Sequence, residues 1–199
     1  MISPDDFWDW FKKNNSKYFF LNQIDDEEEK EKLLNEFLEK LHEYCNKLFF
    51  EIGGFPDEPQ DLIITAEGNI DYFNKVQKLV DAAPDLKDWN IIAFKPPKEF
   101  GYITDYEDVS LNPEEIWFSP IQNKSAFGLK IFINEFSPEK EEDYRFATAI
   151  ALDNLLGEKL NAEYIKYLEL EKMPSNPKKL GLMELRALPE YINRQKKIS

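Results

Sequence analysis

Two short apolar runs with a helical stretch between them constrain the fold of this chain more than any other feature. The runs DLIITA (61–66) and WNIIAFK (89–95) have the length and the β-branched content of buried strands. Between them, from about Ile70 to Ala83, apolar residues recur at helical spacing, and Pro84 ends that pattern. This order predicts two parallel strands that are joined by a crossover helix.

The same order of elements occurs twice along the chain. A strand at 48–52 precedes the first crossover, and a hairpin at 115–134, with its turn at 123–125, precedes a helix and a strand at 163–170. The sequence therefore predicts an α+β protein with a single mixed β-sheet of about six strands and helices packed on it. A variant of this prediction divides the sheet into two ββαβ halves. The alternative is an α/β doubly wound sheet, which the antiparallel hairpin disfavours.

The predicted elements are organised as one domain that spans residues 1–199. Residues 1–47 form an N-terminal helical section, whose first helix begins at Ser3 because a hydroxyl there satisfies free backbone N–H groups. Residues 172–199 form a C-terminal linker and helix. The stretch 96–114 is polar and lacks periodicity, so we expect a long loop that is either functional or mobile.

An excess of acidic residues limits the partners of this chain. Asp and Glu number 39 against 25 Lys and Arg, which gives a net charge of −14 at pH 7. Such a surface repels phosphate groups, so we expect no binding to nucleic acid and none to anionic membranes. The charge is compatible with a basic protein partner, and equally with solubility alone.

Compartment and membrane topology also follow from composition. No stretch approaches the roughly 18 continuous apolar residues that a membrane span needs. The first residues lack the basic and apolar pattern of a signal peptide. A single cysteine, Cys45, allows no internal disulfide and fits a reducing compartment. We therefore expect a cytoplasmic protein.

The chain is poor in residues that carry out catalysis or bind metal. His42 and Cys45 are the single His and the single Cys, and Zn²⁺ would need two further ligands of comparable quality. Gly-rich phosphate loops are absent, so we expect neither a metal nor a cofactor. Triads of the Ser–His–Asp or Cys–His type would depend on His42, which flanks the apolar stripe of its helix. These counts favour a non-catalytic protein, with acid–base chemistry by carboxylates left open.

Three polar residues are candidates for a ligand site. Glu67 and Asn69 flank a glycine directly after the strand at 61–66, and open sheets tend to bind ligands at strand ends. Asp153 interrupts the apolar run at 146–158, where a carboxylate has to be paired or functional. The structural alternative for Glu67 and Asn69 is a capped turn. The structural alternative for Asp153 is a position at the helix edge, where it holds a loop N–H or a Lys.

Aromatic side chains are concentrated in the first helix and around the stretch 96–114. Most of them are expected in the core. If the N-terminal FWDWF (7–11) were exposed, it would mark a protein-binding surface.

The segment ITAEGNIDYFNKVQKLVDAAPDLKDWNIIAFKPP (64–97) resembles a family of uncharacterised bacterial proteins. In that family a strand ends in a corner of small residues, Gly and Asn. A helix, an Ala-Pro stop, a Trp and an AF-K-PP strand follow. The family has no assigned activity, so the resemblance implies no site residue and no cofactor.

Two hypotheses for function follow. The favoured one is a non-catalytic cytoplasmic protein that binds a basic protein partner, because the charge is strongly negative and catalytic residues are scarce. The alternative is a small-molecule enzyme or ligand-binding domain whose site lies near Glu67 and Asn69, walled by 96–114 and reached by Asp153. Convergence of Glu67 and Asp153 on one cavity would favour the alternative.

Overall fold

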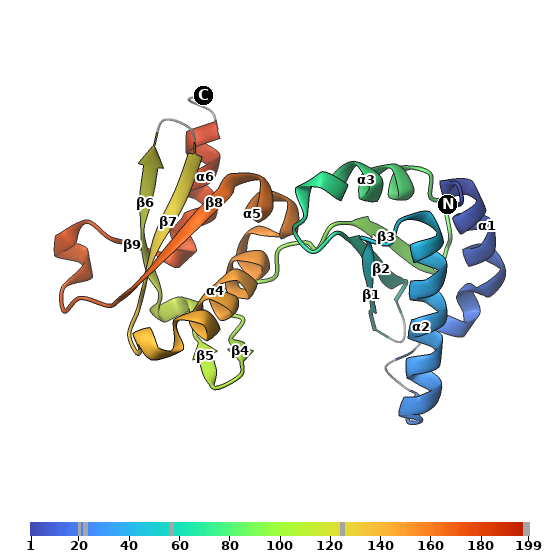
Figure 1. The fold of residues 1–199 in the computed structure, drawn as a ribbon, viewed down its shortest axis with the longest axis horizontal. Coiled ribbons are helices and arrows are strands. Elements are labelled where there is room, and N and C mark those ends of the chain that lie inside the picture. Colours follow the sequence, from blue (N-terminus) through green and yellow to red (C-terminus); the bar gives the residue numbers. More distant parts are fainter. Residues whose placement is uncertain (20, 22–23, 56–57, 124–125, 197–199) are drawn as a thin grey trace. The chain divides into compact units, whose positions relative to one another are not determined.

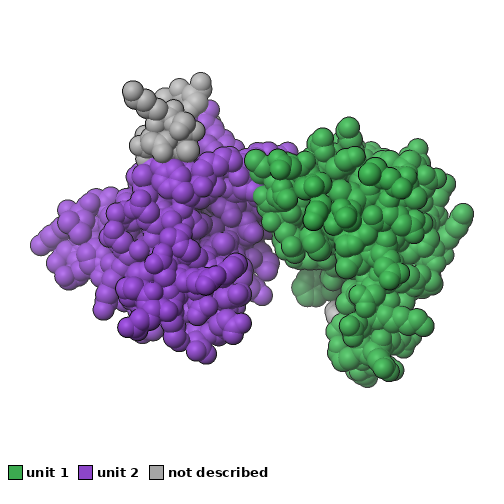
Figure 2. All heavy atoms as spheres, viewed as in Figure 1, with its two compact units in different colours: residues 1–95 green, residues 96–199 purple. Residues whose placement is uncertain are grey.

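A computed structural model describes residues 1–19, 21, 24–55, 58–123 and 126–196. The chain separates into two compact units, residues 1–95 (unit 1) and residues 96–199 (unit 2), as Figures 1 and 2 show. The described residues form six α-helices and three sheets, of three, two and four strands, so the protein is α+β. Among the described residues, every helix is too short or too polar to cross a membrane. The expectation of one domain over 1–199 stays a prediction.

Unit 1 packs three α-helices on one face of a three-stranded sheet (Figure 1). The middle strand β2 pairs with β1 in antiparallel and with β3 in parallel orientation, and α3 connects the two parallel strands. The elements are α1 (Pro4–Asn14), α2 (Glu27–Tyr44), β1 (Phe49–Gly53), β2 (Gln60–Thr65), α3 (Phe73–Asp81) and β3 (Trp89–Ala93). Short 3-10 turns lie at Asn15–Tyr18 and Ile70–Tyr72. The predicted parallel crossover is therefore present.

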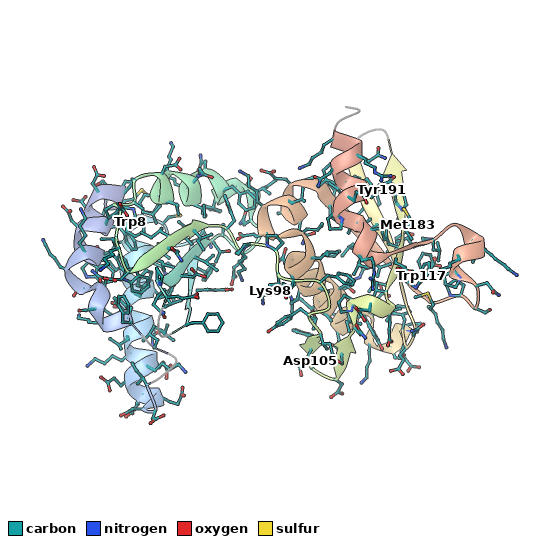
Figure 3. The ribbon with its side chains drawn as sticks, turned by 180° about the vertical axis from the view of Figure 1, so that it is seen from behind. Trp8, Lys98, Asp105, Trp117, Met183 and Tyr191 are labelled. Atoms are coloured by element: carbon teal, nitrogen blue, oxygen red, sulfur yellow. The ribbon has the colours of Figure 1, made fainter. Side chains whose placement is uncertain are left out.

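An aromatic cluster forms the core of unit 1. The ring of Phe37 on α2 lies 5.8 Å from the rings of Phe7 and Phe11 on α1, centre to centre. Trp8, labelled in Figure 3, donates its indole N–H to the carbonyl oxygen of Leu79 on α3 at 2.7 Å. Phe7, Trp8 and Phe11 are buried, and the partly buried Trp10 packs against Phe7 and Phe37, so the aromatic side chains of FWDWF belong to the core of unit 1 and do not form an exposed binding surface.

Unit 2 is built on a four-stranded sheet with the order β8-β7-β6-β9. Strand β6 pairs antiparallel with β7 and β9, and β7 pairs parallel with β8. Trp117 and Met183, labelled in Figure 3, lie on the neighbouring strands β6 and β9. The elements are β4 (Thr104–Tyr106), β5 (Val109–Leu111), β6 (Trp117–Asn123), β7 (Ala126–Ile133), α4 (Glu141–Leu156), α5 (Glu158–Tyr164), β8 (Ile165–Lys172), β9 (Met183–Glu184) and α6 (Leu188–Lys196).

The prediction of a single six-stranded sheet is wrong. Strands β1, β2 and β3 pair with one another in unit 1, while β6, β7, β8 and β9 form a second sheet in unit 2. In both units the ββαβ order places the second strand in the middle, with partners on both sides. Each middle strand therefore has a hydrogen-bonded partner strand along both of its edges within its own unit. The doubly wound alternative also fails, because each of these sheets contains an antiparallel pair.

The stretch 96–114 is more ordered than its composition predicts. It contains the two-stranded sheet β4–β5, which packs against α4 (Figure 1). Its strands are three residues long, which is too short for an alternating pattern to be recognised. The predicted strand at 163–170 begins later, because α5 occupies the residues before Ile165. Of the predicted turn at 123–125, residues 124 and 125 lie outside the described part of the chain.

Candidate functional site

Local hydrogen bonds shape the corner that follows β2. Glu67 and Gly68 have φ angles of 49° and 77°, so the chain turns through the left-handed region. The hydroxyl of Thr65 accepts the N–H of Glu67 at 2.9 Å. The side chain of Asn69 accepts the N–H of Asp71 at 3.2 Å, as a helix cap does. The side chain of Asn69 therefore caps the turn that follows it, as the structural interpretation of this residue predicts.

Asp153 joins two helices of unit 2. Its carboxylate accepts a 2.7 Å hydrogen bond from the side-chain amide of Asn161 on α5, and its carbonyl oxygen accepts the N–H of Gly157. These contacts fix the junction between α4 and α5. The three predicted site residues are thus divided between the units, with Glu67 and Asn69 in unit 1 and Asp153 in unit 2. Their convergence on a ligand stays a prediction.

His42 and Cys45 contact residues of their own unit at the C-terminal end of α2. Nε2 of His42 lies 3.1 Å from the carbonyl oxygen of Leu48, and the imidazole packs edge-on against Phe49. Cys45 is buried at the C-terminal end of α2. Within the described ranges, no group of three or more His, Cys, Asp and Glu side chains is arranged to hold a metal ion.

One side of α4 is exposed and apolar. The buried residues of this helix are Tyr144, Ala147, Thr148, Ala151, Leu152 and Leu156, and four of them, Tyr144, Ala147, Leu152 and Leu156, belong to the core of unit 2. On the other side Phe146 is 49% exposed and Ile150 is 40% exposed. These two residues are four apart and are therefore neighbours on the helix surface. Large apolar side chains at this level of exposure are candidates for contact with another protein.

The β4–β5 sheet extends this apolar surface. The ring of Tyr106 on β4 stacks on that of Phe146, with 5.3 Å between ring centres and 26° between planes. Figure 1 shows β4 and β5 beside the first half of α4, where Phe146 lies. We name Tyr106, Phe146 and Ile150 the α4 apolar face. Aromatic and aliphatic side chains in contact with one another are the usual anchors of protein interfaces.

Carboxylates border the α4 apolar face. Glu142 lies one turn before Phe146 on the same helix, and Glu107 and Asp108 follow Tyr106 in the β4–β5 turn. The nearby cations pair with one acid of this border and with one acid outside it, which leaves Glu107 and Glu142 as its negative charges. Lys140 forms a 3.2 Å ion pair with Asp108, and Arg145 forms a 2.8 Å ion pair with Glu141. The border therefore keeps a negative balance around its apolar centre.

A second feature of unit 2 is a cavity of about 260 Å³ next to β5 and the end of β7. It is lined by Ile103, Ser110, Leu111, Asn112, Glu115, Ile116, Ile133, Asn134, Glu135 and Tyr144. The hydroxyl of Tyr144 donates a 2.6 Å hydrogen bond to the carbonyl oxygen of Glu135, which fixes the chain after β7 along one wall.

Sequence reasoning missed both features of unit 2. The run at 146–158 is apolar nearly all round, a pattern typical of a helix that is packed on more than one side, so the sequence gives no sign that Phe146 and Ile150 are exposed. The residues that line the cavity come from β5, the turn at 113–115, the end of β7 and α4. No local pattern connects segments so far apart in the chain.

Comparison with known proteins adds no assignment to these sites. Neither a protein family nor a curated protein nor a solved structure matches the chain.

Proposed function

We propose that this protein binds a basic protein partner through the α4 apolar face and is not itself a catalyst. The observation that carries the proposal is the half-exposed pair Phe146 and Ile150 on α4, with Tyr106 stacked on the first of them. Apolar side chains exposed in contact with one another favour burial against a partner. An aromatic residue at the centre of such a surface supplies much of the binding free energy.

The charge around this face selects the class of partner. Glu107 and Glu142 lie at its border, and the whole chain has a net charge of −14. A partner whose apolar side chains are flanked by Lys and Arg complements the apolar centre of the α4 apolar face and its acidic border. The net negative charge also accelerates encounter with a basic surface, and salt screens this effect. An amphipathic basic segment of a protein therefore fits best.

A matched pair of peptides and a matched pair of variants test the proposal. The probes are two helical peptides with the same Leu face, one with Lys and one with Glu on the polar face. We expect the Lys peptide alone to bind, with affinity that falls as salt rises. Phe146→Ser with Ile150→Ser should weaken binding by about tenfold or more, since interface anchors contribute more than about 1.4 kcal/mol.

Leu180→Ser is the control variant. Leu180 is 65% exposed in unit 2 and lies outside the α4 apolar face, so its replacement should leave binding unchanged. Thermal melts of each variant verify that it is folded. Equal binding of both peptides, or equal loss with the Leu180→Ser variant, would show that the α4 apolar face is not the binding surface.

A further inference from the structure

We infer that the cavity next to β5 and the end of β7 binds an ammonium or guanidinium group carried on an aliphatic chain. The inference rests on the lining of this cavity and does not depend on the proposed role of the α4 apolar face.

The floor of the cavity is apolar and fixed. Leu111, Ile116 and Ile133 line it, and each of them is at most 5% exposed because the rest of its side chain belongs to the core of unit 2. The volume of about 260 Å³ lies just below the roughly 300–1,000 Å³ of common ligand sites. A group the size of one extended side chain fits such a space, and its aliphatic part would cover the apolar floor.

The rim of the cavity is rich in oxygen acceptors. Glu115 and Glu135 are the acidic residues that line it. The side-chain amide nitrogen of Asn112 donates a 3.5 Å hydrogen bond to Glu115, while its oxygen accepts the backbone N–H of Glu114. Within the described residues, neither Glu115 nor Glu135 forms an ion pair, whereas the adjacent Glu114 lies 3.6 Å from Arg186. Two carboxylates without a cation repel an anionic ligand and attract a cationic one.

The donor set favours an organic cation over a metal ion. A hard cation such as Ca²⁺ takes about six to eight oxygen ligands, and its binding is not helped by an apolar floor. Here the acidic lining residues Glu115 and Glu135 are exposed, while the apolar lining residues Leu111 and Ile133 are buried. An alkyl ammonium or guanidinium group satisfies both parts, because its charged end binds carboxylates while its methylene groups cover apolar surface.

Such a group has two sources, a free alkyl amine or the Lys or Arg side chain of a protein. The probes are therefore n-pentylamine and Nα-acetyl-lysine methylamide, with n-pentanol as the neutral control, each titrated into the full-length protein. We expect both amines to shift the backbone amide resonances of Ser110 and Asn134, and pentanol to shift neither. Binding by both amines indicates a protein side chain as the occupant, and binding by pentylamine alone indicates a free amine.

Two variants of equal charge test the role of the carboxylates. Glu115→Gln with Glu135→Gln should weaken amine binding about tenfold or more, because glutamine keeps the shape of glutamate but lacks the negative charge that binds the ammonium group. Glu139→Gln with Glu163→Gln removes the same charge elsewhere in unit 2 and should leave binding unchanged. Amine binding that survives the first pair of substitutions, or equal binding of pentanol, overturns the inference.

The Phe146→Ser and Ile150→Ser double variant separates this inference from the proposed function. We expect it to bind pentylamine like the wild-type protein, because neither residue lines the cavity. Loss of amine binding in that folded variant counts against a separate site, whatever the peptide experiment shows.

Discussion

Tyr167 on β8 lies directly over Gly128 on β7, so that a Cβ at position 128 would come within 2.3 Å of the Tyr167 ring. The two residues are paired across the parallel strands. The hydroxyl of Tyr167 donates a 3.2 Å hydrogen bond to the carbonyl oxygen of Ile121 on β6. The ring therefore spans three strands and needs the space that a glycine leaves.

Gly128→Ala should destabilise unit 2 by about 1–3 kcal/mol, because the methyl group forces Tyr167 out of its position. Urea unfolding measures the change. Gly53→Ala is the control, since no heavy atom lies within 4 Å of a Cβ at Gly53, and we expect a change below about 0.5 kcal/mol. An unchanged unfolding midpoint for Gly128→Ala would mean that Tyr167 does not occupy this position.

Tyr18→Phe should leave unit 1 as stable as before, or stabilise it by about 1 kcal/mol. The Tyr18 side chain is buried, and its hydroxyl has no hydrogen-bond partner among the described residues, so its desolvation is uncompensated. Tyr44→Phe is the matched comparison, because the hydroxyl of Tyr44 donates to the carbonyl oxygen of Lys75. Its removal should cost about 1 kcal/mol at neutral pH. A Tyr18→Phe protein that melts clearly lower than wild type contradicts this account.

Alkaline pH should destabilise unit 1 through Tyr18. Burial, and secondarily the charge of Glu36, raises the pKa of Tyr18 above that of an exposed tyrosine. The stabilising effect of a raised pKa is complete below the unfolded value of about 10 and is lost as the pH rises above it. Melting temperatures between pH 8 and 11 should therefore fall less steeply for Tyr18→Phe than for wild type. Parallel curves for the two proteins would rule out this role.

Ser3→Ala should destabilise unit 1 by about 1 kcal/mol, because it removes the cap of α1. The hydroxyl of Ser3 accepts the N–H of Asp6 at 3.1 Å, and the carboxylate of Asp6 accepts the N–H of Ser3 at 2.9 Å. Ser137→Ala is the control, since the side chain of Ser137 makes no cap hydrogen bond. Thermal melts at pH 7 compare the two variants, and equal losses would show that the Ser3 cap contributes nothing specific.

The hydrogen bonds between Ser3 and Asp6 should also affect how stability depends on pH in the acidic range. Hydrogen bonds from the side chain and then the backbone of Ser3 lower the pKa of Asp6. A lowered pKa stabilises the folded state above the unfolded value of about 3.9, and the effect disappears as the pH falls below it. Between pH 5 and about 2, the Ser3→Ala protein should therefore lose less stability than wild type. Identical acid limbs would contradict the link between Ser3 and Asp6.

Separate expression of residues 1–95 and 96–199 should give two folded proteins. Each unit has its own sheet, and unit 2 has a continuous core in which Phe118 and Leu129 are fully buried. We expect cooperative thermal unfolding of each piece by circular dichroism. If either piece is unfolded alone, the chain folds as the one domain that its length and composition predict.

Local features of the fold could be predicted from the sequence because they depend on neighbouring residues. The start of α1 at Ser3, the cap at Asn69 and the crossover from β2 through α3 to β3 all follow from spacing and capping chemistry. The sequence predicts a loop N–H or a Lys as the partner of a structural Asp153, and the structure shows a hydrogen bond to its carboxylate from the side-chain amide of Asn161 on α5.

Features that depend on distant segments could not be predicted. Strand partners are chosen by contacts between residues far apart in sequence, so the repeated ββαβ order indicated two halves but not that these halves form separate sheets. The exposure of Phe146 depends on how far the β4–β5 sheet covers α4, which its helical spacing does not record. The cavity walls, at Glu115 and Glu135 among others, meet only after the sheet of unit 2 has formed.

The outer strands of the unit 1 sheet have a consequence for behaviour at high concentration. Within that unit β1 and β3 have a partner strand on one side, so backbone groups along their outer edges can recruit a foreign strand. Both strands are only five residues long, Glu51 and Lys95 form an ion pair beside them, and Pro96 and Pro97 follow β3 without N–H donors. The outer edges of β1 and β3 are therefore short, charged or followed by proline, and these features oppose edge-to-edge aggregation in a concentrated solution.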